Sequence, residues 1–284
     1  MSLNTASEAL DSAKEITERG LDFLRSHSNP EEQQVFLYDL SHASSAIAIA
    51  ESFLSFAEKG EEEKGIVELF CADTLRAVAT MCFGREDIWG LESSTLGVLN
   101  QYVAEHGTPQ KYSIASLSSQ KSHLSDELEL VAKTFRRFGK DHIEHLAEQV
   151  HRKDLDVPEE IIAGLAQMGC FGLSIPEEYG GSASGSIKDM YGMVIATEEL
   201  SRASLSIGGS LITRPEILAR AIENGGTDEQ KRTLLPKIAS GDLMSAVAVT
   251  EPDHGSDVAS IAMSARLEPS GGWKLNGVKT WCTF

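Results

Sequence analysis

The spacing of apolar and polar residues predicts that most of this chain is helical and that strands form only near its end. Segments of helical length and composition recur up to about residue 240. Within these segments, apolar residues return every three or four positions. We expect helices over 43–56, 65–83, 98–105, 126–151, 158–168, 188–201, 210–224 and 228–239. From Leu243 onward the apolar runs are short and are followed by turn residues, which favours strands. The expected fold class is therefore mainly α with the start of a β domain.

Prolines and capping residues set several of these boundaries. Asn29 before Pro30, followed by two acidic residues, is typical of a helix start, because asparagine caps the first turn and proline fits the first helical position. Pro215 should start or kink the helix in which it lies. Pro236 should kink or end the next helix, because proline removes a backbone hydrogen bond.

The acidic residues are unevenly distributed, and this marks a division of the chain. Residues 1–105 contain 19 acidic and 7 basic residues, whereas the remainder contains 24 and 18. Residues 107–122 are rich in serine and have little apolar pattern, as a linker would. We therefore expect an acidic helical extension over 1–105, a linker over 106–122, a helical domain over 123–242 and the start of a β domain over 243–284.

The overall charge narrows the class of partner. The net charge is −18, so neither nucleic acid nor an anionic membrane surface is expected to bind, since both require a basic patch. No apolar run reaches the roughly 18 residues of a membrane helix. The first residues lack the basic and apolar parts of a secretory signal. We therefore expect a cytoplasmic protein.

Metal-ligating residues are not grouped in the sequence. His142 and His145 lie three residues apart on an expected helix, but no further ligand accompanies them. The four cysteines have no metal-like spacing and are expected to be reduced and mostly buried. They are Cys71, Cys82, Cys170 and Cys282. No metal site is expected.

The segment 247–257 has the strongest chemical signal in the chain. Three apolar residues lead into Thr250, and Glu251 with Pro252 should end this strand, because proline cannot donate to a sheet. A Gly-Ser-Asp turn follows at 255–257. It offers hydroxyls and free backbone N–H groups, which suit a phosphate or another anionic group. This strand and loop form a candidate binding site.

A second segment, residues 273–283, is expected to lie beside the first. Asn276 and Gly277 favour a tight hairpin turn. The strand after that turn would carry Trp281 and Thr283 on one face. Cys282 would then turn its thiol to the opposite face, while its backbone could still line a ligand. The loop and the strand together could hold a flat aromatic cofactor.

Four segments in order resemble the acyl-CoA dehydrogenase family. Residues 250–257 match the family's Thr-Glu-Pro-x-x-Gly-Ser-Asp loop, and residues 277–283 match its Gly-x-Lys-x-Trp-x-Thr strand. Upstream, residues 165–181 resemble its Leu-x-x-x-Gly-x-x-Gly-x-x-x-Pro-x-x-Tyr-Gly-Gly segment. Residues 198–202 resemble part of the helix that follows. The resemblance covers roughly residues 120–284.

The resemblance implies a fold and a cofactor. It implies a helical acyl-CoA dehydrogenase-like N-terminal domain followed by the beginning of a middle β-barrel domain, with an extra helical extension in front. It also implies that this chain is the N-terminal portion of a longer protein. The cofactor would be FAD. The residues that match its contacts in the family are Val247, Val249, Thr250, Ser256, Trp281, Cys282 and Thr283.

The resemblance also implies a reaction and its participants. In the family a carboxylate removes the α proton of an acyl-CoA thioester while hydride leaves the β carbon for the flavin. That carboxylate is usually a glutamate of the C-terminal helical domain. No residue here matches it, so no catalytic residue is assigned. Electrons would pass to electron-transferring flavoprotein, and a homodimer or homotetramer is expected.

Two residues are expected to contact the acyl-CoA substrate. Ser256 resembles the serine that the family places between the flavin and the CoA part of the substrate. Arg214 lies where the family lines its acyl pocket with apolar or amide residues. A guanidinium there could hold a substrate carboxylate in a bidentate pair. An arginine on the surface of a helix turn is the alternative.

Other functions fit the same sequence. An acyl-CoA oxidase or a flavin monooxygenase would share the fold and would differ mainly in the access of oxygen to the flavin, which the sequence does not show. A non-catalytic scaffold with a relic flavin fold is a further alternative. The intact Thr250, Ser256, Trp281 and Thr283 argue against that alternative.

Overall fold

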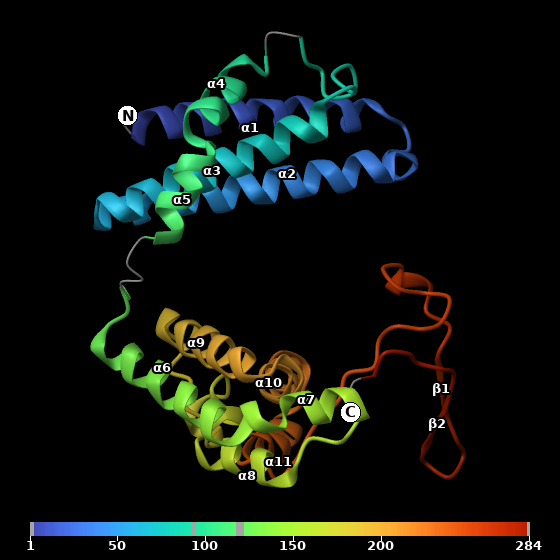
Figure 1. Cartoon of the computed structure of the whole chain (residues 1–284). Helices are drawn as coiled ribbons and strands as arrows, with labels where there is room; N and C mark the ends of the chain where they lie inside the picture. The colour runs from blue at the N-terminus through green and yellow to red at the C-terminus, as the bar shows by residue number, and fades with distance from the viewer. Residues whose placement is uncertain (1–2, 93–94, 118–121, 283–284) are drawn as a thin grey trace. The chain divides into compact units, whose positions relative to one another are not determined.

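The computed structural model describes residues 3–92, 95–117 and 122–282, and it divides the chain into two compact units between residues 121 and 122 (Figure 1). Both units are helical, and a two-stranded sheet follows the helices of the second. The predicted fold class, mainly α with the start of a β domain, is confirmed in this respect. None of the described helices is long and apolar enough to cross a membrane.

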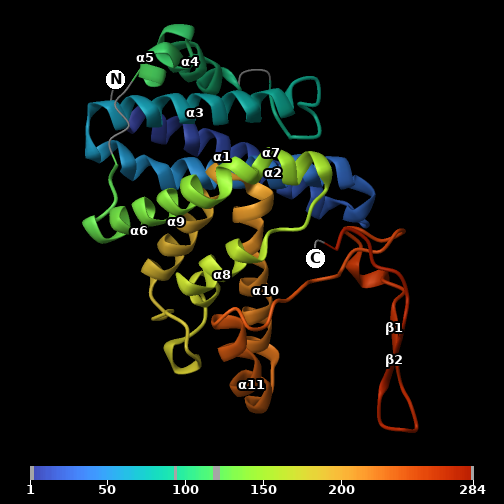
Figure 2. The same cartoon turned by 60° about the horizontal axis from the view of Figure 1, so that its bottom comes forward.

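The first unit is built on three long helices that lie side by side (Figure 2). Helix α4 contacts α1 and α3, and α5 contacts α3. The helices are α1 (Leu3–Ser26), α2 (Gln34–Phe53), α3 (Glu61–Cys82), α4 (Gly97–His106) and α5 (Pro109–Leu117), with 3₁₀ turns at Pro30–Gln33 and Leu54–Lys59. Part of the segment expected to be a linker is therefore helical.

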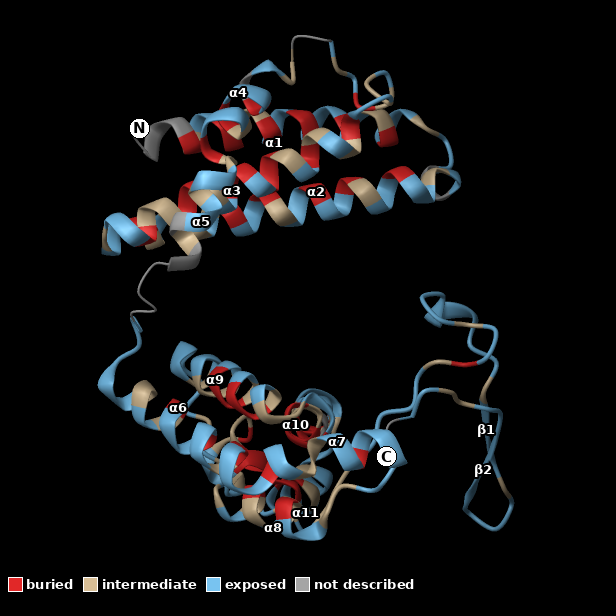
Figure 3. Ribbon diagram, viewed as in Figure 1, coloured by how far each residue is buried: buried red, intermediate tan, exposed pale blue. Residues whose placement is uncertain are grey.

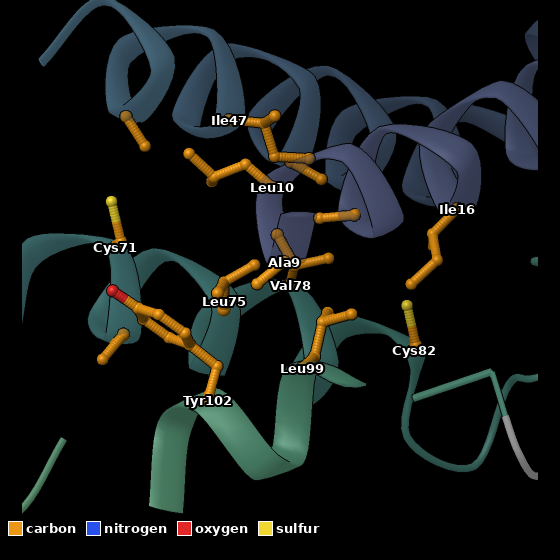
Figure 4. Packing of buried hydrophobic residues seen from close by; sticks show 14 of the residues in the cluster. Ala9, Leu10, Ile16, Ile47, Cys71, Leu75, Val78, Cys82, Leu99 and Tyr102 are labelled. Carbon is orange, nitrogen blue, oxygen red and sulfur yellow. The ribbon is translucent and has the colours of Figure 1, made fainter. Parts of the chain in front are cut away.

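The core of the first unit is formed by the apolar faces of α1 to α4 (Figure 4). Leu10 and Ile16 of α1 meet Ile47 of α2 in one buried cluster. Leu75 of α3 and Leu99 of α4 complete it. Burying each such side chain contributes roughly 1.5–3 kcal/mol. The first unit therefore has a hydrophobic core of its own.

The second unit contains the remaining helices and the sheet. Single π turns at Gly139–Ile143 and Leu205–Gly209 connect α6 to α7 and α9 to α10, and α10 and α11 continue past Pro215 and Pro236. The elements are α6 (Asp126–Phe138), α7 (Glu144–Lys153), α8 (Glu159–Gln167), α9 (Ile187–Ala203), α10 (Ser210–Gly225), α11 (Asp228–Ala239), β1 (Ser264–Leu267) and β2 (Trp273–Asn276), with 3₁₀ turns at Cys170–Gly172, Glu177–Tyr179 and Val258–Ser260.

A buried carboxylate joins α6 to α9. Glu199 is 3% exposed and accepts hydrogen bonds from Arg136 Nε at 2.9 Å and Nη2 at 2.6 Å. Arg202 Nε also donates to it, at 3.2 Å. The hydrogen bonds from Arg136 hold the pKa of Glu199 below its usual range, because they stabilise the charged form. This cluster fixes the helix that carries motif residues 198–202 against α6.

The Tyr-Gly-Gly sequence makes a tight turn after the 3₁₀ segment. Gly180 has a φ of +82°, a left-handed conformation that favours glycine. A Cβ on Gly181 would lie 1.9 Å from the carbonyl oxygen of Ile175. The Ala183 N–H donates to that same oxygen at 2.9 Å. Both glycines of the motif are therefore required by the backbone, not by a ligand.

The strands β1 and β2 form an antiparallel hairpin, and the residues of both strands are all exposed (Figure 3). Leu267 pairs with Trp273, and the connecting turn contains Gly271 at a φ of +88°. The prediction of a hairpin turn at Asn276 and Gly277 is therefore wrong. Asn276 ends β2 instead. Gly277 is needed because a Cβ there would lie 2.8 Å from the Met263 side chain.

Candidate cofactor site

Direct contacts join the two segments that carry the flavin-like motifs. Lys279 Nζ donates to the Val249 carbonyl at 2.7 Å and lies 2.9 Å from Glu251 Oε1. The Thr280 N–H donates to the Thr250 carbonyl at 2.9 Å. The loop that begins at Thr250 and the segment that carries Trp281 are therefore neighbours.

Glu251 is the centre of this junction. Its side chain is 5% exposed, and its carboxylate accepts the Ala262 N–H at 2.6 Å and the Met263 N–H at 2.9 Å. The Ala262 N–H and then the Lys279 ammonium lower the pKa of Glu251 to about 2. Glu251 is therefore ionised near neutral pH, and its oxygens are already bonded. This arrangement suits a structural carboxylate and not a proton acceptor.

The loop after Glu251 closes on itself. The Glu251 N–H donates to the His254 carbonyl at 3.0 Å, and the His254 N–H donates back at 3.2 Å. Farther along, the Val258 N–H donates to the Ser256 carbonyl at 3.0 Å. The side chain of Ser256 is left exposed. Its hydroxyl is therefore accessible to a ligand.

The strands expected on either side of the site are not formed in the described residues. Residues 244–250 and 277–282 lie outside the sheet, and Trp281 has a φ of +58°, which interrupts strand alternation. A strand needs a row of backbone partners. Among the residues described, the Thr280–Thr250 bond is the single backbone hydrogen bond between the two segments. The prediction of a strand that carries Trp281 and Cys282 is therefore wrong for the described residues.

Apolar side chains are exposed at the junction. Trp281 is 89% exposed, and Val247 and Val249 are 41% and 45% exposed. An indole as exposed as that of Trp281 is normally covered in a folded protein, and it matches the face of a flat aromatic ring. The hydroxyls of Thr250 and Ser256 are the polar groups of the same segment, and the polar edge of a ring needs such partners. The residues present therefore fit a flavin.

The other expected cofactor residues lie at the end of the second segment. Cys282 is exposed. Thr283 lies outside the described residues. The other three thiols are buried, and burial raises the pKa values of Cys71, Cys82 and Cys170 to about 11, 12 and 12.

Lys279 and Glu251 are positioning residues that are not among the cofactor residues predicted from the sequence. Glu251 belongs to the first motif and Lys279 to the second. The signal in the sequence that could have predicted their contact is therefore an acidic residue in one motif and a basic residue in the other. Their opposite charges indicate a contact between segments that lie 28 positions apart. The structure shows that contact, and it orders the residues on either side.

Arg214 lies in α10, and its side chain is outside what the structure describes. Its neighbours are ordered: Leu211 and Ile212 are buried in the core of the second unit. Thr213 donates its hydroxyl to the Ser210 carbonyl at 3.0 Å. The role of Arg214 in binding a substrate carboxylate remains a prediction.

Two other features of the second unit do not belong to this site. A groove of about 800 Å³ lies between the 173–176 segment, the start of α9 and α10, and none of the candidate residues that the structure describes lines it. Within the described part of the chain, no three His, Cys, Asp or Glu side chains are grouped to hold a metal ion. The motif junction is therefore the candidate site.

Comparison with known proteins defines the class. Residues 125–242 match the acyl-CoA dehydrogenase N-terminal domain. Residues 125–242 therefore belong to the acyl-CoA dehydrogenase family, and the chain matches the N-terminal portion of its members. The predicted resemblance is confirmed. So is the acyl-CoA dehydrogenase-like helical domain, which extra helices precede.

Each individual relative matches slightly more than half of this chain. A (2S)-methylsuccinyl-CoA dehydrogenase of Cereibacter sphaeroides is 43% identical over 57% of this chain and 28% of its own length. A 3-(aryl)acrylate reductase of Clostridium sporogenes is 38% identical over 56% and 41%. The solved structure of a glutaryl-coenzyme A dehydrogenase with glutaryl-CoA superposes on this chain with a TM-score of 0.50 at 33% identity. The aligned part covers 57% of this chain and 40% of the glutaryl-coenzyme A dehydrogenase chain. The match thus spans less than half the length of each of these relatives.

Proposed function

We propose that this chain is the N-terminal portion of an FAD-dependent dehydrogenase that converts (2S)-methylsuccinyl-CoA to mesaconyl-CoA and passes the electrons to electron-transferring flavoprotein. The observation that carries the proposal is the junction at Glu251 and Lys279, where the two motif segments meet. Acyl-CoA dehydrogenase motifs and a surface suited to a flat ring coincide there.

The cofactor part of the proposal rests on the exposed surface at this junction. The hydroxyls of Thr250 and Thr283 would bond the polar edge of the flavin, Trp281 would lie against the ring, and the backbones of Val247, Val249 and Cys282 would line it. When bound, FAD supplies the acceptor for the hydride that leaves the substrate β carbon. Ser256 would lie between the flavin and the CoA part of the substrate.

The proton acceptor is not among the residues that we assign. A general base must be free to accept a proton and must lie within hydrogen-bonding distance of the carbon it deprotonates. Glu251 does not meet the first requirement, because its oxygens are bonded to Lys279 and to two backbone N–H groups. Its role in the proposal is to position Thr250, which is adjacent in the chain.

The names of two relatives support a dicarboxylic acyl group. The Cereibacter relative is named for methylsuccinyl-CoA, and the solved relative holds glutaryl-CoA, so both names concern thioesters of dicarboxylic acids. Arg214 would supply the cation that a second carboxylate needs in a buried pocket.

The lengths of the relatives bear on the helical extension. The 162 aligned residues are 28% of the Cereibacter protein, whereas the 165 aligned residues are 41% of the Clostridium protein. The former is therefore the longer protein, with room for an extension.

The full-length protein that contains this chain tests the proposal. We expect it to be yellow after reconstitution with FAD, to lose its flavin absorbance when methylsuccinyl-CoA is added without oxygen, and to reduce electron-transferring flavoprotein. A colourless protein after reconstitution would contradict the cofactor assignment. Rapid hydrogen peroxide formation in air would indicate an oxidase, and a yellow protein that no acyl-CoA bleaches would indicate a non-catalytic scaffold.

A further inference from the structure

The outer face of α2 carries a stripe of exposed, uncharged residues along the whole helix. Figure 3 shows exposed segments at intervals along α2. The stripe follows the alternating three- and four-residue spacing of a coiled-coil seam. Its members, all exposed, are Val35, Tyr38, His42, Ser45, Ile49 and Ser52. A seam of this kind normally packs against another helix.

The two charged side chains of α2 are neutralised within the first unit. Asp39 pairs with Arg85 at 2.5 Å, and Glu51 pairs with Lys14 of α1. None of the exposed residues of α2 is an Asp, Glu, Lys or Arg. The stripe is therefore uncharged, although residues 1–105 carry 12 more acidic than basic residues.

This contrast indicates which partner fits. A basic partner would bind where the carboxylates are, not at an uncharged stripe. An equally acidic partner would be repelled by every acidic face and could approach closely only where the surface is neutral. We propose that a second copy of this chain packs its own α2 against this stripe.

The order of residues in the stripe is self-complementary when the second helix is antiparallel. A twofold axis midway between His42 and Ser45 places Tyr38 of one copy opposite Ile49 of the other. It also places Val35 opposite Ser52, and His42 opposite Ser45. Each layer thus combines a larger with a smaller side chain or an aromatic with an aliphatic one, as close packing requires.

The serine at the centre of the stripe can be buried without an unsatisfied donor. The Ser45 hydroxyl donates to the Ser41 carbonyl one turn earlier, at 2.8 Å. The cost of removing it from water is therefore small. Beside the stripe, a groove of about 420 Å³ is lined by Leu37 and Ser45 of α2 and by Leu21 of α1. This groove offers space for side chains of the second copy that flank the seam.

Two cysteine variants of the full chain test the antiparallel register. Tyr38→Cys and Ile49→Cys are prepared separately, each combined with Cys282→Ser to remove the exposed native thiol. In the proposed dimer, residue 38 faces residue 49, whereas two copies of residue 38 are about 16 Å apart along the helices. We expect an intermolecular disulfide when the two variants are mixed and oxidised, and little in either variant alone. Equal cross-linking in all three samples, or none, would overturn the proposal.

A charge variant tests the same surface by sedimentation. Ile49→Glu places a carboxylate opposite Tyr38 of the second copy and should weaken association of the full chain at least about tenfold. The matched control is Phe83→Glu, since Phe83 is also exposed but lies outside α2; it should leave association unchanged. Association unaffected by Ile49→Glu would show that a different partner or a different part of the protein covers α2.

Discussion

Lys279 bonds both the backbone and the side chain of the opposite loop: its Nζ lies 2.7 Å from the Val249 carbonyl oxygen and 2.9 Å from Glu251 Oε1. One cation thus orders the residues on both sides of the candidate flavin surface. This contact does not depend on a strand ladder between the two segments.

Replacing the cation should weaken cofactor binding. Lys279→Met in the full-length protein removes the charge-assisted bonds to both Val249 and Glu251. We expect the dissociation constant for FAD to rise about tenfold or more, as the loss of such bonds implies. Flavin fluorescence during titration measures it.

The control for this variant is Lys274→Met, because Lys274 is exposed on β2 and lies outside the junction. It should change the FAD dissociation constant by less than about twofold. Similar effects of both variants would show that net charge, and not the contact with Glu251, determines FAD affinity.

The Glu251 carboxylate predicts a specific acid dependence of stability. Its pKa is lowered from 4.5 to about 2 in the folded chain, so its stabilising contribution is complete above about pH 4.5 and is lost as the pH falls towards 2. Glu251→Gln should therefore lower Tm most above pH 4.5, and the difference from the natural chain should shrink below that. Thermal denaturation between pH 2 and 7 measures this. A difference that is constant with pH would mean that Glu251 does not titrate in this way.

The cluster on α6 and α9 should contribute measurably to stability. Arg136→Ala leaves the buried Glu199 without its bidentate partner. We expect a loss of about 2 kcal/mol, less than the roughly 3–5 of a fully buried pair because the Arg136 side chain is half exposed. Urea denaturation of both variants gives the comparison.

The neighbouring Arg137 provides the control, since it is exposed and lies 3.5 Å from Asp141. Arg137→Ala should cost less than about 0.5 kcal/mol. If the two arginine variants were equally stable, Arg136 would be no more than a surface charge.

Arg214 should select for a substrate carboxylate. In the full-length enzyme, Arg214→Ala should lower kcat/KM for methylsuccinyl-CoA by about two to four decades, which corresponds to losing roughly 3–5 kcal/mol from a buried pair. The neutral 2-methylbutyryl-CoA is the matched substrate and should be little changed or improved. Equal losses with both substrates would assign Arg214 to the fold, and no loss with either would place it on the surface.

Most of the helices, although not α1, could be predicted from the sequence because each depends on signals within itself. The 126–151 segment has an N-cap at Ser125, whose side chain accepts the Leu128 N–H, and the structure places α6 and α7 there. The serine-rich composition after residue 107 suggested a linker, whereas helix α5 occupies part of that segment and contacts α3. That contact between distant segments has no signal in the local sequence.

The strands were predicted less well, because a strand depends on its neighbour. Asn276 and Gly277 have the residue types of a hairpin turn, yet consecutive glycines at 271 and 272 form it, and Gly277 instead avoids Met263. The motifs did indicate which segments meet. Their junction is made by Lys279 and Glu251, and neither is a residue that the family resemblance assigns to the cofactor.

The exposure of Cys282 has a practical consequence for labelling. Thiol reagents attack the thiolate, and burial suppresses thiolate formation at Cys71, Cys82 and Cys170. A maleimide dye added at neutral pH should therefore attach to Cys282 first, one position from Trp281, without any engineered substitution. The natural chain thus provides its own attachment point for a fluorescent reporter beside the surface where we expect the isoalloxazine ring.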